Sequence, residues 1–90
     1  MKKMVAEVIG PNPPCYRCIA LKENVDVVAR KLRAEGMEVE VKRLDIISRE
    51  VLRKYGLLLS PVLAVNGTVV TMGWIPDKGT VETILREAAK

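Results

Sequence analysis

Residues 4–18 read MVAEVIGPNPPCYRC, and this stretch decides the fold. Met4–Ile9 is apolar except for Glu7, a pattern that predicts a strand buried on both faces. Gly10–Pro14 holds three prolines and a glycine, which exclude regular structure there. Tyr16–Glu35 carries apolar side chains at helical spacing, so we expect a helix that begins at the two cysteines. These apolar side chains are Leu21, Val25, Val28 and Leu32.

Outward from this stretch, the chain alternates between strand and helix patterns. Glu38–Leu44 alternates apolar with charged residues, which predicts a half-buried strand near a sheet edge. Ser48 is placed to cap a short helix over Arg49–Tyr55. The middle of the chain therefore adds a strand and a short helix.

The last third of the chain predicts a hairpin and a final helix. Asn66–Gly67 lies between two β-branched runs, Val62–Val65 and Thr68–Thr71, and this dipeptide is the strongest short-range hairpin signal. Asp77 is placed to cap a helix that ends at Ala89.

The predicted order of elements is β-α-β-α-β-β-α. A strand-helix-strand start implies a right-handed crossover and a parallel strand pair, whereas the hairpin adds an antiparallel pair. We therefore expect an α/β fold in which a four-stranded mixed sheet is flanked by helices. Residues 1–90 suffice for one domain and not for two.

Composition excludes several function classes. The 15 basic residues are spread among 11 acidic ones, which predicts a mixed-charge surface and no nucleic-acid partner. No apolar run approaches the ~18 residues that span a bilayer, and the N-terminal segment lacks a cleavage site, so we expect no membrane and a cytoplasmic protein. Gln is absent and Asn occurs three times, which tilts toward a thermophilic source.

The two cysteines carry the predicted chemistry. Cys15 begins a helix, where unpaired N–H groups and the helix dipole favour the reactive thiolate, and Arg17 and Lys22 add positive charge. Cys18 lies one turn further in and within disulfide reach, so it is expected to be more buried and less ionised. Cys15 would then attack a substrate disulfide, and Cys18 would resolve the mixed disulfide.

Two other interpretations of the cysteine pair stay open. The cysteines could be small buried apolar residues at a helix start. They could also bind a metal, although zinc needs four ligands and the chain has no His and no other Cys. Only a dimer or an external ligand could complete such a site, and we expect no resident metal or cofactor.

Ser60–Pro61 opens the predicted third strand, where proline is tolerated. Generic X–Pro bonds are cis in only ~5% of cases, so the residues alone favour trans.

Taken together, these residues carry a resemblance to a known family. From Met4 to Ala89 the chain resembles the thioredoxin-like superfamily, and it is most similar to small thioredoxin/glutaredoxin-like proteins of archaea and thermophilic bacteria. The matching features are Cys15-Tyr16-Arg17-Cys18 after the first strand, Ser60–Pro61 before the third, Asn66–Gly67 in the hairpin and Gly73 after the fourth.

The resemblance implies a thiol–disulfide oxidoreductase that acts as a monomer on protein disulfides and is recycled by a reductase. It also implies that the bond before Pro61 is cis, that Pro61 faces the cysteines and that the backbone beside it pairs with the substrate peptide. Tyr16, Arg17, Ser60 and Pro61 are the substrate-contact residues on this interpretation.

The chain also departs from the family pattern. Tyr-Arg stands between the cysteines where thioredoxins have Gly-Pro, and Pro14 stands where they have Trp. The stretch Gly73–Asp77 is loosely similar to the glutathione-binding stretch of glutaredoxins, so use of glutathione stays open. Trp74 could shape the substrate groove or simply pack.

Glu7 also has two interpretations. As a buried carboxylate it could carry the proton of Cys18, as the buried acid of thioredoxins does, or it could face outward.

Three other functions compete with the oxidoreductase. One is a metal-binding or metal-delivery module; copper chaperones, however, end in a strand and place Met where this chain has Pro13. Another is a redox-inert binding module, which would not need both cysteines. The last is a dimer that holds an iron–sulfur cluster through Cys15 and glutathione.

Overall fold

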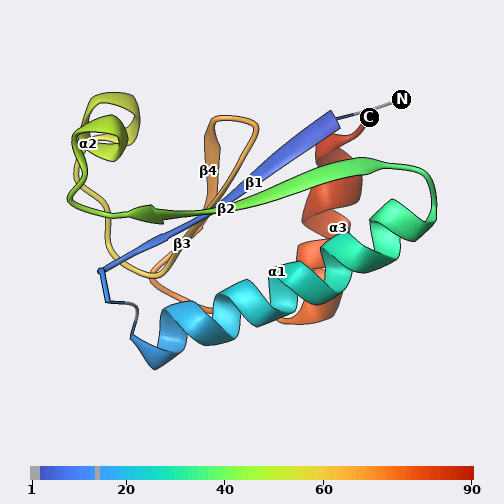
Figure 1. Cartoon of the computed structure of the whole chain (residues 1–90), viewed down its shortest axis with the longest axis horizontal. Helices are drawn as coiled ribbons and strands as arrows, with labels where there is room; N and C mark the ends of the chain where they lie inside the picture. The colour runs from blue at the N-terminus through green and yellow to red at the C-terminus, as the bar shows by residue number, and fades with distance from the viewer. Residues whose placement is uncertain (1–2, 14) are drawn as a thin grey trace.

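The computed structural model describes residues 3–13 and 15–90 and contains a four-stranded sheet with helices on both faces (Figure 1). Its elements in chain order are β1 (Lys3–Gly10), α1 (Tyr16–Ala34), β2 (Glu38–Asp45), α2 (Arg49–Tyr55), β3 (Val62–Val65), β4 (Thr68–Met72) and α3 (Lys78–Ala88). The order β-α-β-α-β-β-α is the predicted one, and its boundaries differ from the predicted ones by one residue at most.

The sheet has the strand order β2-β1-β3-β4, so the first strand lies in the interior and β2 and β4 form the edges. β1 pairs in parallel with β2 and antiparallel with β3, and β3 pairs antiparallel with β4. The predicted mixed sheet is thereby confirmed, including the position of β2 at an edge.

Two apolar clusters lie on opposite faces of the sheet. The larger one packs α1 and α3 against alternate residues of β1, namely Met4, Ala6 and Val8. The smaller one packs Val51 of α2 against Ile9 of β1 and its neighbours in β3. Because side chains alternate between faces, the odd-numbered residues of β1 face α2 and the even-numbered ones face α1.

The hairpin between β3 and β4 turns at Asn66–Gly67, as predicted. Asn66 and Gly67 both have positive φ, at 51° and 84°, which suits asparagine and glycine. The side chain of Asn66 also accepts a hydrogen bond from the backbone N–H of Val5 in β1 at 2.9 Å. The turn therefore ties the hairpin to the interior strand.

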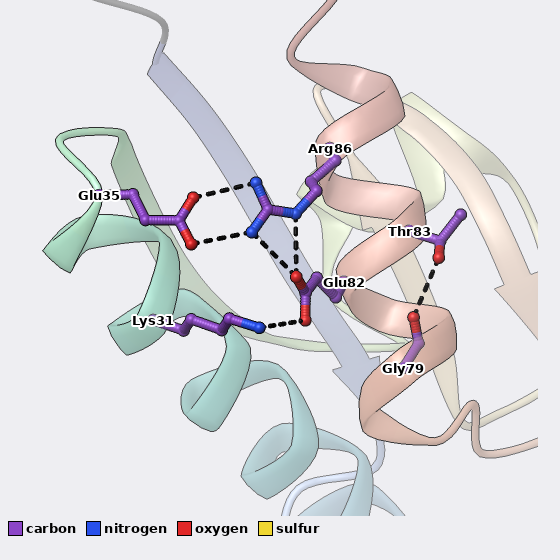
Figure 2. A network of polar contacts seen from close by, with 6 residues as sticks. All are labelled: Lys31, Glu35, Gly79, Glu82, Thr83 and Arg86. Atoms are coloured by element: carbon purple, nitrogen blue, oxygen red, sulfur yellow. Dashed lines mark hydrogen bonds and ion pairs between the residues drawn. The ribbon is translucent and has the colours of Figure 1, made fainter.

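An ion-pair network joins the end of α1 to α3 (Figure 2). The guanidinium of Arg86 donates to both carboxylate oxygens of Glu35, at 3.0 and 2.9 Å, and to Glu82 at 2.9 Å. Lys31 donates to the other oxygen of Glu82 at 3.0 Å. These contacts lie at the end of α1 remote from the cysteines, so they fix the helix without contributing to the site.

Candidate active site

The strand register brings three separate segments together at one end of the strands. Ile9, near the end of β1, pairs with Val62, the first residue of β3, and Val62 pairs with Met72, the last residue of β4. Three segments therefore lie at the same end of the sheet's strands. They are the cysteine loop that follows β1, the Ser60–Pro61 dipeptide before β3, and Gly73 after β4.

Cys15 occupies the N-cap position of α1. Its backbone is extended, with φ −75° and ψ 166°, and its carbonyl accepts the N–H of Ile19 at 3.1 Å. The side chain is exposed, and its sulfur lies 3.5 Å from that of Cys18. The backbone N–H of Cys18 lowers the pKa of the Cys15 thiol, and the side-chain hydrogen bond between the two thiols lowers it further. Cys15 thus has the environment of a nucleophile.

Cys18 has the opposite environment. Only 2% of its surface is exposed. Burial raises its pKa, the neighbouring Cys15 raises it further, and the positive charge of Arg43 opposes both. The two thiols are free in this structure and differ in the direction predicted from their positions in the helix.

Gly10 makes the close approach of Cys18 to β1 possible. A Cβ atom at Gly10 would lie 2.2 Å from the sulfur of Cys18 and 3.9 Å from the Cβ of Ser60. The Cys18 sulfur and the Ser60 side chain therefore both lie near the same point beside the backbone of Gly10. Sequence reasoning treated Gly10 as part of a loop and missed this contact. In the structure Gly10 is the last residue of β1, and a glycine within a strand often marks a close approach.

Arg17 and Pro61 are linked through the backbone of Gly73. The guanidinium of Arg17 donates to the carbonyl of Gly73 at 3.1 Å, and the N–H of Gly73 donates to the carbonyl of Pro61 at 2.9 Å. The Ser60–Pro61 bond is cis, as is the Asn12–Pro13 bond, for which the sequence offered no specific signal. These two hydrogen bonds connect the start of α1, the segment after β4 and the segment before β3.

Several apolar side chains lie exposed in and around these segments. Tyr16, between the cysteines, is 79% exposed, and Trp74, next to Gly73, is 49% exposed. Leu57 and Leu59, in the segment that leads to Ser60, are 92% and 72% exposed. These side chains leave apolar area exposed around the cysteines and the Ser60–Pro61 segment. Pro14 lies outside the described residues.

Glu7 is a buried carboxylate, as the first of its two interpretations requires, and the outward-facing interpretation is wrong. It is buried, with 6% exposed, so it does not face outward. It lies on the α2 face of β1, where the hydroxyl of Tyr55 donates to its carboxylate and the ammonium of Lys54 approaches it at 3.7 Å. Cys18 belongs to α1 on the other face, so Glu7 serves as an acceptor that fastens α2 to the sheet.

Metal-binding clusters and membrane-spanning helices are both absent from the described residues. Among them, no three His, Cys, Asp or Glu side chains come together as a metal site. Within residues 3–13 and 15–90, no helix combines the length and the apolarity needed to cross a bilayer.

Comparison with known proteins gives a family match. The family model described as "Thioredoxin domain" matches residues 4–86. The solution structure of oxidised thioredoxin from Plasmodium falciparum superposes with a TM-score of 0.67 at 14% identity, covering 99% of this chain and 84% of that one. The X-ray structure of Fasciola hepatica thioredoxin gives a TM-score of 0.58 at 21% identity, covering 98% of this chain and 79% of that one.

A germline-specific thioredoxin, Deadhead of Drosophila melanogaster, gives a TM-score of 0.62 at 16% identity, covering 96% of this chain and 81% of that one. No curated protein sequence matches the chain. At these identities the structural neighbours support the fold, and the family match extends over nearly the whole sequence.

Proposed function

Because this chain belongs to the thioredoxin-domain family, we propose that it is a thiol–disulfide oxidoreductase that reduces protein disulfides through Cys15 and Cys18. One observation carries the proposal: an exposed thiol of lowered pKa lies 3.5 Å from a buried thiol of raised pKa. This asymmetry supports the roles that we propose, with Cys15 as the nucleophile and Cys18 as the resolving thiol.

In the first step, the Cys15 thiolate attacks one sulfur of a substrate disulfide. The substrate S–S bond breaks, a mixed disulfide forms at Cys15, and the other substrate sulfur leaves as a thiolate. In the second step, Cys18 gives its proton to solvent and attacks the sulfur of Cys15. The mixed disulfide breaks, the second substrate thiolate leaves, and the protein retains the Cys15–Cys18 disulfide.

The substrate has gained two electrons, and the protein has lost two. Turnover therefore requires a reductase or a small thiol that returns them, and we include such a partner in the proposal. No resident cofactor is needed for either step, because both use only sulfur atoms of the protein and its substrate.

We further propose that Tyr16, Arg17, Ser60 and Pro61 form the substrate-contact surface. Gly73 hydrogen-bonds to both Arg17 and Pro61, and Ser60 lies beside the glycine that contacts Cys18. The exposed Tyr16 ring offers apolar area for a bound peptide. A monomer in the cytoplasm, with glutathione as one candidate reductant, completes this proposal.

The proposal is tested with purified reduced protein and insulin as the disulfide substrate. We expect the wild type to reduce insulin in the presence of dithiothreitol and Cys15→Ser to be inactive. Cys18→Ser should still attack and then accumulate as a mixed disulfide, which mass spectrometry detects. Undiminished activity of Cys15→Ser would overturn the assignment of the nucleophile.

The same preparations distinguish oxidoreduction from metal binding. We expect the purified protein to carry less than stoichiometric metal and to cycle between dithiol and disulfide. Protein that retains one zinc per chain or per dimer and fails to reduce insulin would instead favour a metal-binding module.

A further inference from the structure

Arg43 follows two apolar residues in one row of β2. Val39 is buried in the larger apolar cluster, and Val41 packs against it. Arg43 follows at the same two-residue spacing, so its side chain leaves the strand on the face covered by α1. The partner of Arg43 in the β1–β2 register is Val8, which lies two residues before Gly10 in β1. The positive charge of Arg43 therefore lies on the face of the sheet covered by α1, near the strand ends that carry the candidate active site.

The guanidinium of Arg43 is held beside the cysteine loop. It donates to the carbonyl of Pro11, 32 residues away in sequence. Arg43 and Cys18 line the same cavity of about 210 Å³. The other lining residues are Ile19, Lys22, Glu23 and Asp26. Arg43 and Cys18 thus share one small space between α1 and the end of β2.

The charged side chains that line this cavity differ in whether another charge neutralises them. Lys22 forms an ion pair with Asp26 at 2.8 Å, so their charges largely cancel at Cys18. Glu23 is exposed, where solvent screens its charge. Among the residues that the structure describes, Arg43 has no carboxylate within ion-pair distance and bonds a neutral carbonyl. Its positive charge is therefore not neutralised by an ion pair within the described part of the chain.

We propose that Arg43 is a positioning residue for the second step of disulfide exchange, because its guanidinium stabilises Cys18 as the thiolate that attacks Cys15. This inference rests on the proposed function, since it concerns only the thiol that resolves the mixed disulfide. It also assigns a role that Glu7, on the other face of the sheet, does not fill.

The physical argument concerns the proton of Cys18. Burial raises the pKa of this thiol, and Cys15 raises it further, so at neutral pH few molecules carry the attacking thiolate. The positive charge of Arg43 acts in the opposite direction. Once the substrate is bound to Cys15, that sulfur no longer carries a negative charge, and Arg43 remains the charged side chain that favours ionisation of Cys18. The proton leaves to solvent, the Cys18–Cys15 bond forms, and the substrate thiolate departs.

The two steps can be separated with an aromatic disulfide such as Ellman's reagent. Attack by Cys15 releases one coloured thiolate, and resolution by Cys18 releases a second, so a stopped-flow trace at equimolar reagent has two phases. We expect Arg43→Gln to leave the first phase unchanged and to slow the second by about three- to tenfold at neutral pH, the effect of removing one partly screened charge. The pH midpoint of the second phase should move upward.

Two variants serve as controls for this measurement. Arg43→Lys keeps the charge and should restore the second phase to within about twofold of the wild type. Arg33→Gln removes another guanidinium that donates to a backbone carbonyl, that of Val39 at 2.8 Å, far along α1 from the cysteines. It should leave both phases and the pH midpoint unchanged. If Arg43→Gln fails to fold, Arg43→Met, which keeps the apolar stem, takes its place.

The outcomes separate this inference from the proposed function. Two phases in the wild type, with an unchanged second phase and pH midpoint in the variant that lacks the charge, would overturn the role of Arg43 alone. A wild type that shows no second phase, or a second phase that persists in Cys18→Ser, would overturn the exchange mechanism itself.

Discussion

Replacement of Gly10 by alanine should push the sulfur of Cys18 out of position. Gly10 is not among the residues with positive φ, so its backbone accepts an alanine. The new Cβ, however, would lie 2.2 Å from the Cys18 sulfur and 3.4 Å from its Cβ. The first contact is far inside van der Waals distance, so either the sulfur or the strand must move.

The size of the effect follows from two opposing contributions. Forcing extra volume into a packed interior costs about 1–3 kcal/mol. Replacing glycine by alanine in a compatible conformation restores about 0.4–1 kcal/mol by restricting the unfolded chain. With Cys18→Ala the sulfur is absent, so the nearest atom of residue 18 is the Cβ and only the favourable contribution remains. The interaction energy between the two substitutions should therefore be about 1–3 kcal/mol.

The assay is a double-mutant cycle of equilibrium urea unfolding under reducing conditions. Its four proteins are the wild type, Gly10→Ala, Cys18→Ala and the double variant. In the Cys18 background, Gly10→Ala should lower the free energy of unfolding; in the Cys18→Ala background it should leave it unchanged or raise it. An equal cost in both backgrounds would refute the close approach of Gly10 to the sulfur as the reason for glycine at this position.

The remaining predictions concern titration and stability. Alkylation of Cys15 by iodoacetamide, followed by mass spectrometry, should have a pH midpoint below that of an ordinary cysteine, about 8.5, whereas Cys18 should react only above it. Tyr55→Phe removes the donor to the buried carboxylate of Glu7 and should lower the free energy of unfolding by about 1–3 kcal/mol, whereas an unchanged urea midpoint would contradict that bond. The carboxylates that pair with Arg86 have lowered pKa values, so their contribution is present above their unfolded pKa and is lost as the pH falls through the folded one. Arg86→Gln should accordingly lower the melting temperature at neutral pH and low salt, and this difference should disappear in acid and shrink at high salt.

The elements of the fold could be predicted because each leaves a local pattern. Leucine and valine at helical spacing predict α1 from one stretch of chain, and Asn66–Gly67 predicts the hairpin from two residues. The position of the two cysteines at the start of a helix can likewise be inferred from a single short stretch of sequence. Periodicity and turn chemistry therefore sufficed for the order of elements and for the asymmetry between Cys15 and Cys18.

The remaining parts of the site depend on contacts across the sheet, which no local pattern specifies. In the sequence, Arg43 is one more charged residue of a predicted strand. Its approach to Pro11 and Cys18 depends on the register between β1 and β2. Glu7 lies in a strand that is buried on both faces, so the apolar run around it did not indicate which face it joins. Its partner Tyr55 is 48 residues away. These contacts are set by topology, which decides which face each residue meets.

The hydrogen bond between Asn66 and Val5 bears on the chemical ageing of the protein. Asparagine before glycine readily loses its amide through a cyclic imide, in which the backbone nitrogen of the glycine attacks the side-chain carbonyl carbon. Here that side chain is engaged with the N–H of Val5, and the N–H of Asn66 donates to the carbonyl of Val5, both at 2.9 Å. The amide must leave β1 before it can turn toward Gly67. Deamidation in the folded protein should therefore follow the rate at which the hairpin opens locally, and not the faster rate of an exposed dipeptide.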